Sequence, residues 1–257
     1  MKPLGEIIAS SLASIQREYL APVQLVSEKP FLAFASPLTM LASDGNKYVI
    51  KTPHNDQVRR SLFSEQVHAH IGRLIGAPIP NTPLIMVNDA FLAGLTPEQK
   101  GANAAGIAHG SHKTRDCPNR CWVASPDNPY FRDLPNRPEY RENYAAIAIF
   151  FRLFCFDDPQ IIEAEDLPSE IFTVDHGHFL PCGIGWSSDQ LRWFAQATKE
   201  DPTTLPLCFP ENNYNKVRSD IGLTDKELEA PLKKVGKIST EDIVMAVSLP
   251  PDEWGID

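Results

Sequence analysis

The sequence predicts an α+β fold with a β-rich first part and a mainly helical second part. Short apolar runs, broken by prolines and turn residues, fill residues 23–51, and such runs are typical of antiparallel strands. A helical period covers residues 56–75, and a strand-like run covers residues 84–87. Beyond residue 144 the patterns are mainly helical. We therefore expect strands, one helix and a further strand, followed by a helical region.

The domain boundary is expected in a region without long periodicity. Residues 94–139 are rich in Gly, Pro, Asn and Asp, a composition typical of connections and loops. We expect residues 1–93 to form a β-rich, nucleotide-binding lobe. Residues 94–257 would then form a hinge region and a helical C-terminal lobe.

Composition excludes several classes of function. The chain has 257 residues, 42% of them hydrophobic, which is enough for a globular core. A formal net charge of −9 argues against direct nucleic-acid binding. We expect no membrane span, because no uncharged apolar stretch approaches ~20 residues. The start lacks a signal-peptide pattern, and the 5 cysteines lack the dense spacing of a disulfide framework. A cytoplasmic protein with reduced cysteines is expected.

The first part begins with a helix expected over residues 7–19, with Ile8, Leu12 and Ile15 on one face. The strands that follow are expected at residues 23–26, 31–34 and 48–50, separated by Pro30, Pro37 and a turn at residues 43–46. The helix over residues 56–75 should end at Gly76, which suits a left-handed cap.

The second part begins with residues 144–156, which are apolar on nearly every face and predict a buried helix. A strand is expected at residues 171–174. Further helices are expected at residues 189–197, 212–221, 225–235 and 240–247.

Two charged residues close apolar strand-like runs far apart in the chain. Lys51 ends the run Tyr48–Ile50, and Asp175 ends the run Phe172–Val174. A phosphate site needs an ammonium group for the phosphate oxygens and a carboxylate for the bridging magnesium. The pair therefore predicts a kinase-type nucleotide site. The alternative is an ordinary solvated strand end and an ordinary turn aspartate.

Further carboxylates accompany this pair. Glu65 lies in the first helix after the lysine strand, at the edge of its packed face, where it could hold a buried ammonium. Asp157 and Asp158 follow the apolar helix, and Glu163 comes a few residues later. Such residues can orient a hydroxyl group and bind a second magnesium. The alternative for this cluster is an acidic surface loop.

A separate group of residues has zinc-ligand chemistry. His109 and His112 precede Cys117 and Cys121, and zinc accepts nitrogen and sulfur ligands in tetrahedral sites. The spacing does not match a common zinc finger. The alternative is a hinge strand followed by a loop with free cysteines.

Several motifs in order resemble the HipA-like kinase family, in particular its small stand-alone members, from residue 23 onward. They are Ser36–Leu38, Asp44–Lys51, Ser64–Gln66, Leu74–Pro80, Asp157–Asp158, Val174–His178 and Leu249–Trp254. The resemblance implies a two-lobed protein-kinase-like fold that uses ATP and Mg²⁺. It also implies a protein substrate or regulatory partner, with phosphate transfer to a Ser or Thr hydroxyl.

The resemblance also implies roles for individual residues. Lys51 would contact phosphate, Glu65 would be its partner, and Ser36 would belong to the nucleotide loop. Asp175 would bind magnesium. Asp158 would be the catalytic-loop aspartate, with Asp157 as the competing alignment.

Two departures from the family pattern leave a second function open. Pro159 follows Asp158, and Glu163 stands where the family has a metal-binding asparagine. A carboxylate there can bind magnesium but changes the charge of the site. The loop at Ser36 also lacks the glycines that let backbone amides approach phosphates. The alternative to an active kinase is therefore a pseudokinase that senses nucleotide or binds a protein. A weaker third hypothesis is a zinc-organised interaction protein.

Overall fold

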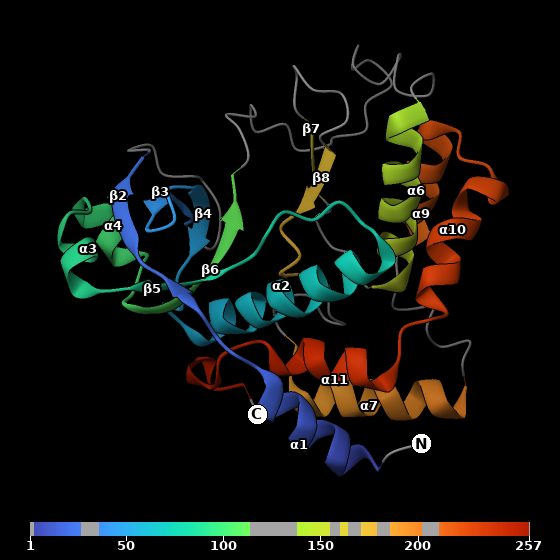
Figure 1. Ribbon diagram of the computed structural model, residues 1–257, viewed down its shortest axis with the longest axis horizontal. Helices are drawn as coiled ribbons and strands as arrows, with labels where there is room; N and C mark the ends of the chain where they lie inside the picture. Colours follow the sequence, from blue (N-terminus) through green and yellow to red (C-terminus); the bar gives the residue numbers. More distant parts are fainter. Residues whose placement is uncertain are drawn as a thin grey trace. The chain divides into compact units, whose positions relative to one another are not determined.

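The structure is a computed structural model that describes residues 3–26, 36–113, 138–154, 160–163, 171–178, 186–201 and 211–256. It has the α+β fold predicted from the sequence (Figure 1). The expected strand at residues 31–34 lies outside the described residues. None of the described helices is long and apolar enough to cross a membrane.

The chain divides into two compact units that are each discontinuous in sequence. The first takes residues 1–69, 80–116 and 240–257, and the second takes residues 70–79 and 117–239. These units do not coincide with a single boundary after residue 93. The physical reason is that strand pairing carries residues 106–112 into the first unit, as described next.

The first unit is built on a six-stranded sheet. Its strands are β1 Tyr19–Leu20, β2 Pro22–Leu25, β3 Leu38–Ala42, β4 Lys47–Lys51, β5 Leu84–Val87 and β6 Gly106–His112. Their order is β1, β5, β6, β4, β3, β2, and the β1–β5 pair is parallel whereas the others are antiparallel. β3 was not predicted from the sequence, and a strand at β6 was predicted only as the hinge strand that is the alternative to a zinc site.

The sheet curls until its two edges meet. β1 and β2 are the edge strands, yet only Ala21 separates them in the chain. Ala21 and Ser43 exchange two hydrogen bonds: the Ala21 N–H donates to Ser43 Oγ at 3.0 Å, and the Ser43 N–H donates to the Ala21 carbonyl at 2.8 Å. These two bonds extend the β2–β3 ladder beyond the Pro22–Ala42 pair.

Alternate residues of the strands fill the inside of this curled sheet. The buried cluster comprises Leu38, Met40, Ala42, Tyr48, Ile50, Ile85, Val87, Leu95 and Ala108. Phe91 and Leu92 pack against it from helix α3, Asp89–Ala93. The short helix α4, Pro97–Gly101, follows with a capping box between Thr96 and Gln99.

The other face of the sheet packs against helix α2, Asp56–Ile75. Its buried cluster contains Val58, Leu62, Leu84, Ile107 and Trp254. Gly76 ends the helix with φ +85°, so the predicted left-handed cap is confirmed. This second face is the one that receives Lys51 and His109, because side chains alternate along a strand.

The two ends of the chain pack together in the first unit. Helix α1, Leu4–Ser14, contacts helix α11, Thr240–Ser248. Arg17 donates hydrogen bonds to the carbonyls of Ser248 at 3.0 Å, Leu249 at 3.4 Å and Pro250 at 3.0 Å. The 3₁₀ turn η4, Asp252–Trp254, follows. Arg17 therefore satisfies the carbonyls that the end of α11 leaves open.

The first helix differs from its prediction. It ends at Ser14 rather than at residue 19, and the chain enters β1 instead. Ile7 and Ser11 are its buried residues, whereas Ile8 and Leu12 are exposed. The apolar period was therefore assigned to the wrong face of the helix.

The second unit is mainly helical. Its described helices are α6 Pro138–Leu153, α7 Ser188–Glu200, α9 Glu211–Ile221 and α10 Asp225–Val235. α6 packs against both α9 and α10 (Figure 1), and its buried face includes Tyr144, Ile147 and Phe150. The helices beyond residue 186 match their predicted ranges closely.

A small hairpin completes the second unit. β7, Gln160–Glu163, pairs antiparallel with β8, Ile171–Val174. The N–H of Thr173 donates to the carbonyl of Pro78 at 2.9 Å, which ties β8 to the segment after α2. β8 was predicted, but β7 was not, because its residues were interpreted as part of either a catalytic loop or an acidic surface loop.

Candidate active site

Lys51 stands at the end of β4 on the face that packs against α2. Its Cα partner on β6 is His109, and the Cα partner of His109 on β5 is Leu84. Residues paired in this way lie on the same face of a sheet. The Lys51 side chain is only 12% exposed, and burial of an ammonium group is costly unless an anion lies next to it.

Glu65 supplies that anion. Lys51 Nζ lies 2.5 Å from Glu65 Oε1, and the Glu65 side chain is 4% exposed. The contact predicted between these two residues is therefore present. A buried ion pair contributes little net stability, because desolvation offsets the attraction. Their role in nucleotide binding stays a prediction.

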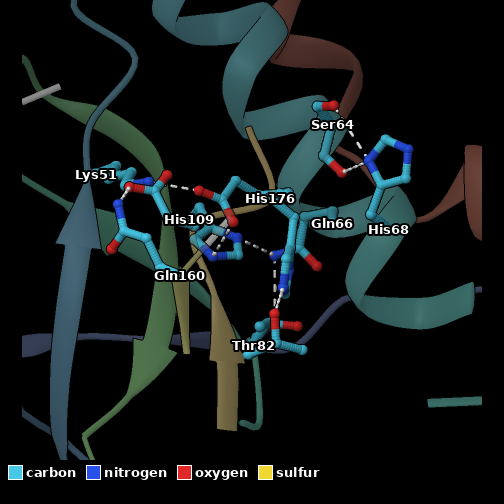
Figure 2. A network of polar contacts seen from close by, with 11 residues as sticks. Lys51, Ser64, Gln66, His68, Thr82, His109, Gln160 and His176 are labelled. Atoms are coloured by element: carbon cyan, nitrogen blue, oxygen red, sulfur yellow. Dashed lines mark hydrogen bonds and ion pairs between the residues drawn. The ribbon is translucent and has the colours of Figure 1, made fainter. Parts of the chain in front are cut away.

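Gln66 and His109 continue the polar network behind Glu65, and this role was not predicted from the sequence. Figure 2 shows Gln66 between Thr82 and His109. Gln66 Nε2 lies 3.1 Å from the Thr82 carbonyl and 3.1 Å from His109 Nδ1. His109 Nε2 faces Glu65 Oε2 at 3.9 Å. No local signal identified this role, because β6 also contains Ser111 and His112.

The zinc hypothesis fails for the histidine pair. His109 and His112 are three positions apart on β6, so their side chains leave the strand on opposite faces. His109 points to α2, whereas the His112 ring lies 5.3 Å from the Tyr48 ring. Cys117 and Cys121 lie outside the described residues. Within the described part of the chain, no group of three or more His, Cys, Asp or Glu residues could hold a metal ion.

His68 is buried one turn after Ser64 on α2. Its Nδ1 lies 2.7 Å from the Ser64 carbonyl and 3.2 Å from Ser64 Oγ. A carbonyl only accepts, so Nδ1 carries the proton. Desolvation lowers the pKa of His68 to about 4, although the Ser64 carbonyl and the Glu65 charge oppose this change. The ring is therefore neutral near pH 7.

Ser36 precedes β3 with an unusual backbone and a polar anchor. Its φ is +40°, a region that side chains other than glycine rarely adopt. Asn103 Nδ2 contacts the Ser36 carbonyl at 3.5 Å and donates to the Gln99 carbonyl at 2.9 Å. Asn103 Oδ1 accepts from Thr52 Oγ1 at 2.9 Å. Thr52 follows Lys51 directly, so Asn103 links the lysine strand to the predicted nucleotide loop.

Asp175 lies directly after β8 in the second unit. Its φ is +61°, which aspartate tolerates better than most residues. Gln160 Nε2 on β7 donates to Asp175 Oδ2 at 3.0 Å. Strained backbone at a strand end is common in active sites. Ser36 and Asp175 are the non-glycine residues with positive φ in the described ranges, and both are predicted site residues.

The residue after Asp175 holds the turn in place. His176 is buried, its Nε2 lies 3.2 Å from Thr173 Oγ1, and its ring meets the Phe150 ring edge-on at 5.2 Å. Gln160 was not predicted as a site residue, because its segment was not predicted as a strand beside β8.

The remaining predicted site residues are less fully described. Asp157 and Asp158 lie outside the described residues. Glu163 belongs to β7, where its Cα partner is Ile171. Lys51 belongs to the first unit and Asp175 to the second, so their convergence on one nucleotide stays a prediction.

The described donors fit magnesium better than a transition metal. Asp175 presents a carboxylate and Gln160 an amide, and hard cations such as Mg²⁺ prefer oxygen ligands. The Lys51 ammonium suits phosphate oxygens. The residues present are therefore chemically compatible with Mg²⁺ and a nucleotide phosphate.

Comparisons with known proteins give a match to a family model and a match to a solved structure. The family model described as "HipA-like kinase" matches residues 24–126. The chain is also similar to a solved structure, the Helicobacter pylori proinflammatory kinase CtkA. The two are 10% identical in sequence, the match covers 84% of this chain and 89% of the CtkA chain, and the TM-score is 0.42. No curated protein matches significantly in sequence.

Proposed function

We propose that the chain, whose residues 24–126 match the HipA-like kinase family model, is an ATP- and Mg²⁺-dependent phosphotransferase. The proposed acceptor is a Ser or Thr hydroxyl of a protein. The proposed partners are thus a nucleotide and a protein substrate or regulator.

The buried pair of Lys51 and Glu65 carries this proposal. A strand lysine paired with a helix glutamate at 2.5 Å has little value as a stabilising contact. It has value as a device that holds an ammonium group in a defined place. In phosphoryl transfer such a group positions the nucleotide phosphates, and rate depends mainly on positioning and charge stabilisation. The family match covers this part of the chain.

Asp175 is proposed as the metal ligand. The amide of Gln160 orients its carboxylate at 3.0 Å, and the backbone at φ +61° sets its direction at the end of β8. When bound, Mg²⁺ would neutralise charge on the phosphates. Asp158, or Asp157 in the competing alignment, is proposed to orient the acceptor hydroxyl, and Glu163 is proposed as a second metal ligand.

A pseudokinase is the second candidate. The observation that favours it is the sequence after Asp158, where Pro159 and Glu163 replace the family pattern. In this case the chain binds nucleotide or a protein partner without transfer.

The test is transfer from radiolabelled ATP in the presence of Mg²⁺. The variants are Asp175→Asn, which keeps a side chain that tolerates positive φ, and Asp189→Asn, which changes an exposed residue of α7. We expect incorporation by the native chain and by Asp189→Asn, and loss of at least ~100-fold in Asp175→Asn. ATP-dependent thermal stabilisation without incorporation would establish the pseudokinase. If ATP caused neither stabilisation nor incorporation, both the phosphotransferase and a nucleotide-binding pseudokinase would be refuted.

A further inference from the structure

The amide of Gln66 has a defined orientation. One of its atoms contacts both the Thr82 carbonyl and His109 Nδ1, each at 3.1 Å. A backbone carbonyl can only accept, so the atom that faces it must be the nitrogen of the amide. The Gln66 nitrogen has two hydrogens, and the second is directed to His109. Gln66 and His109 are both buried, which holds this geometry in place.

The orientation of Gln66 determines the tautomer of His109. Because Gln66 donates to Nδ1, that ring nitrogen must present a lone pair. A neutral imidazole with a lone pair on Nδ1 carries its proton on Nε2. The His109 Nε2–H group then faces Glu65 Oε2 at 3.9 Å. This distance exceeds a hydrogen bond, so the contact is an electrostatic one between an N–H dipole and a carboxylate.

The Glu65 carboxylate is therefore held from two sides. Lys51 Nζ contacts Oε1 at 2.5 Å, and the His109 N–H faces Oε2. The side chains of Glu65 and His109 are 4% and 3% exposed, and electrostatic interactions are stronger where water is excluded. An imidazole with the opposite tautomer would turn a lone pair toward the carboxylate and repel it.

We propose that His109, with its tautomer set by Gln66, is a positioning residue that orients Glu65 and through it the ammonium group of Lys51. One part of the inference, the effect of the Lys51 ammonium position on nucleotide binding, rests on the proposed function. The arrangement of His109 and Glu65 stands on the contacts themselves.

The first test is the tautomer, which is independent of activity. Long-range ¹H–¹⁵N NMR of the full chain with ¹⁵N-labelled histidine distinguishes the two neutral forms among its 7 histidines. His68 is an internal control with the opposite tautomer, because its Nδ1 donates to the Ser64 carbonyl. We expect the Nε2–H form for His109 and the Nδ1–H form for His68 at pH 7.5. An Nδ1–H form or an imidazolium at His109 would overturn the inference.

Variants of Gln66 test the cause of the tautomer. Gln66→Glu replaces the donor with an acceptor beside His109 Nδ1, so we expect a proton to move onto Nδ1 while His68 is unchanged. Gln66→Met removes the donor with little change in shape, and we expect a mixture of tautomers. An unchanged Nε2–H form in both variants would show that Gln66 does not set the tautomer.

The second test is nucleotide affinity. His109→Gln keeps an N–H donor near the position of Nε2, whereas His109→Leu has none. We expect His109→Leu to weaken ATP binding ~5–10-fold and His109→Gln to stay within ~2-fold of the native chain. Equal loss in both variants would indicate a packing role and would overturn the inference. If the native chain and His109→Leu bound ATP with the same affinity, the inference would also be overturned. If the native chain did not bind ATP, the proposed function would be refuted as well.

Discussion

Replacing Lys51 by methionine separates the structural and functional parts of the buried ion pair. The change removes the ammonium 2.5 Å from Glu65 Oε1 and keeps a long apolar side chain. Glu65, at 4% exposure, stays buried and loses this cation. Removal of one partner of a buried pair costs ~3–5 kcal/mol. Because Lys51 is partly exposed and the His109 N–H also faces Glu65, we expect a loss of ~3 kcal/mol.

The double variant Lys51→Met with Glu65→Met tests whether this cost comes from the carboxylate. Replacing both charges with apolar side chains is often nearly neutral, so we expect stability within ~1 kcal/mol of the native chain. The coupling energy of the cycle should then be at least ~2 kcal/mol.

Urea unfolding followed by tryptophan fluorescence provides the assay. Of the 4 tryptophans, Trp254 lies in the first unit, where its indole N–H donates to the Ile107 carbonyl at 2.7 Å. Lys47→Met is the matched control, because Lys47 is exposed at the other end of the same strand. It should change stability by no more than ~0.5 kcal/mol. If Lys51→Met costs no more than this control, or if the two changes at residues 51 and 65 are additive, the buried-pair reasoning is refuted.

Three more predictions concern the packing of each unit. The His68 pKa of about 4 lies below its ordinary 6.5, so the folded state disfavours the protonated ring, and the free energy of unfolding falls as pH drops from 6.5 toward 4. The free energy of unfolding in urea should decrease by ~2 kcal/mol from pH 7 to pH 5. The same decrease in a His68→Gln variant would contradict this. Arg17→Ala removes hydrogen bonds to three carbonyls and should lower the free energy of unfolding by ~2 kcal/mol in thermal unfolding. An unchanged unfolding midpoint would show that Arg17 does not stabilise the packing of the two chain ends. Hydrogen bonds from Arg141 hold the pKa of Glu227 at about 2, below its ordinary 4.5, so this contribution is complete above pH 4.5 and falls as pH drops toward 2; NMR titration of Arg141→Leu should move the pKa back toward 4.5, and no movement would show that another group sets it.

Local sequence patterns were sufficient for most helices and for the lysine strand. The period of α2, the left-handed cap at Gly76 and the helices beyond residue 186 depend on neighbouring residues, so they are readable along the chain. The contact between Lys51 and Glu65 was also foreseen. A lysine that ends a strand and a glutamate on the next helix lie only 14 positions apart.

Strand pairing and the polar network depended on residues far apart in sequence. β6 joins the sheet through β4 and β5, and His109 meets Gln66 across 43 positions. Nothing in the local pattern around His109 distinguishes a zinc ligand from a buried partner of Glu65, because pairing alone decides which face of the strand it occupies. The bond from Gln160 to Asp175 likewise exists only because β7 and β8 pair. Periodicity along the chain thus predicted which segments form helices and strands, whereas register between distant segments placed the polar side chains of the candidate site.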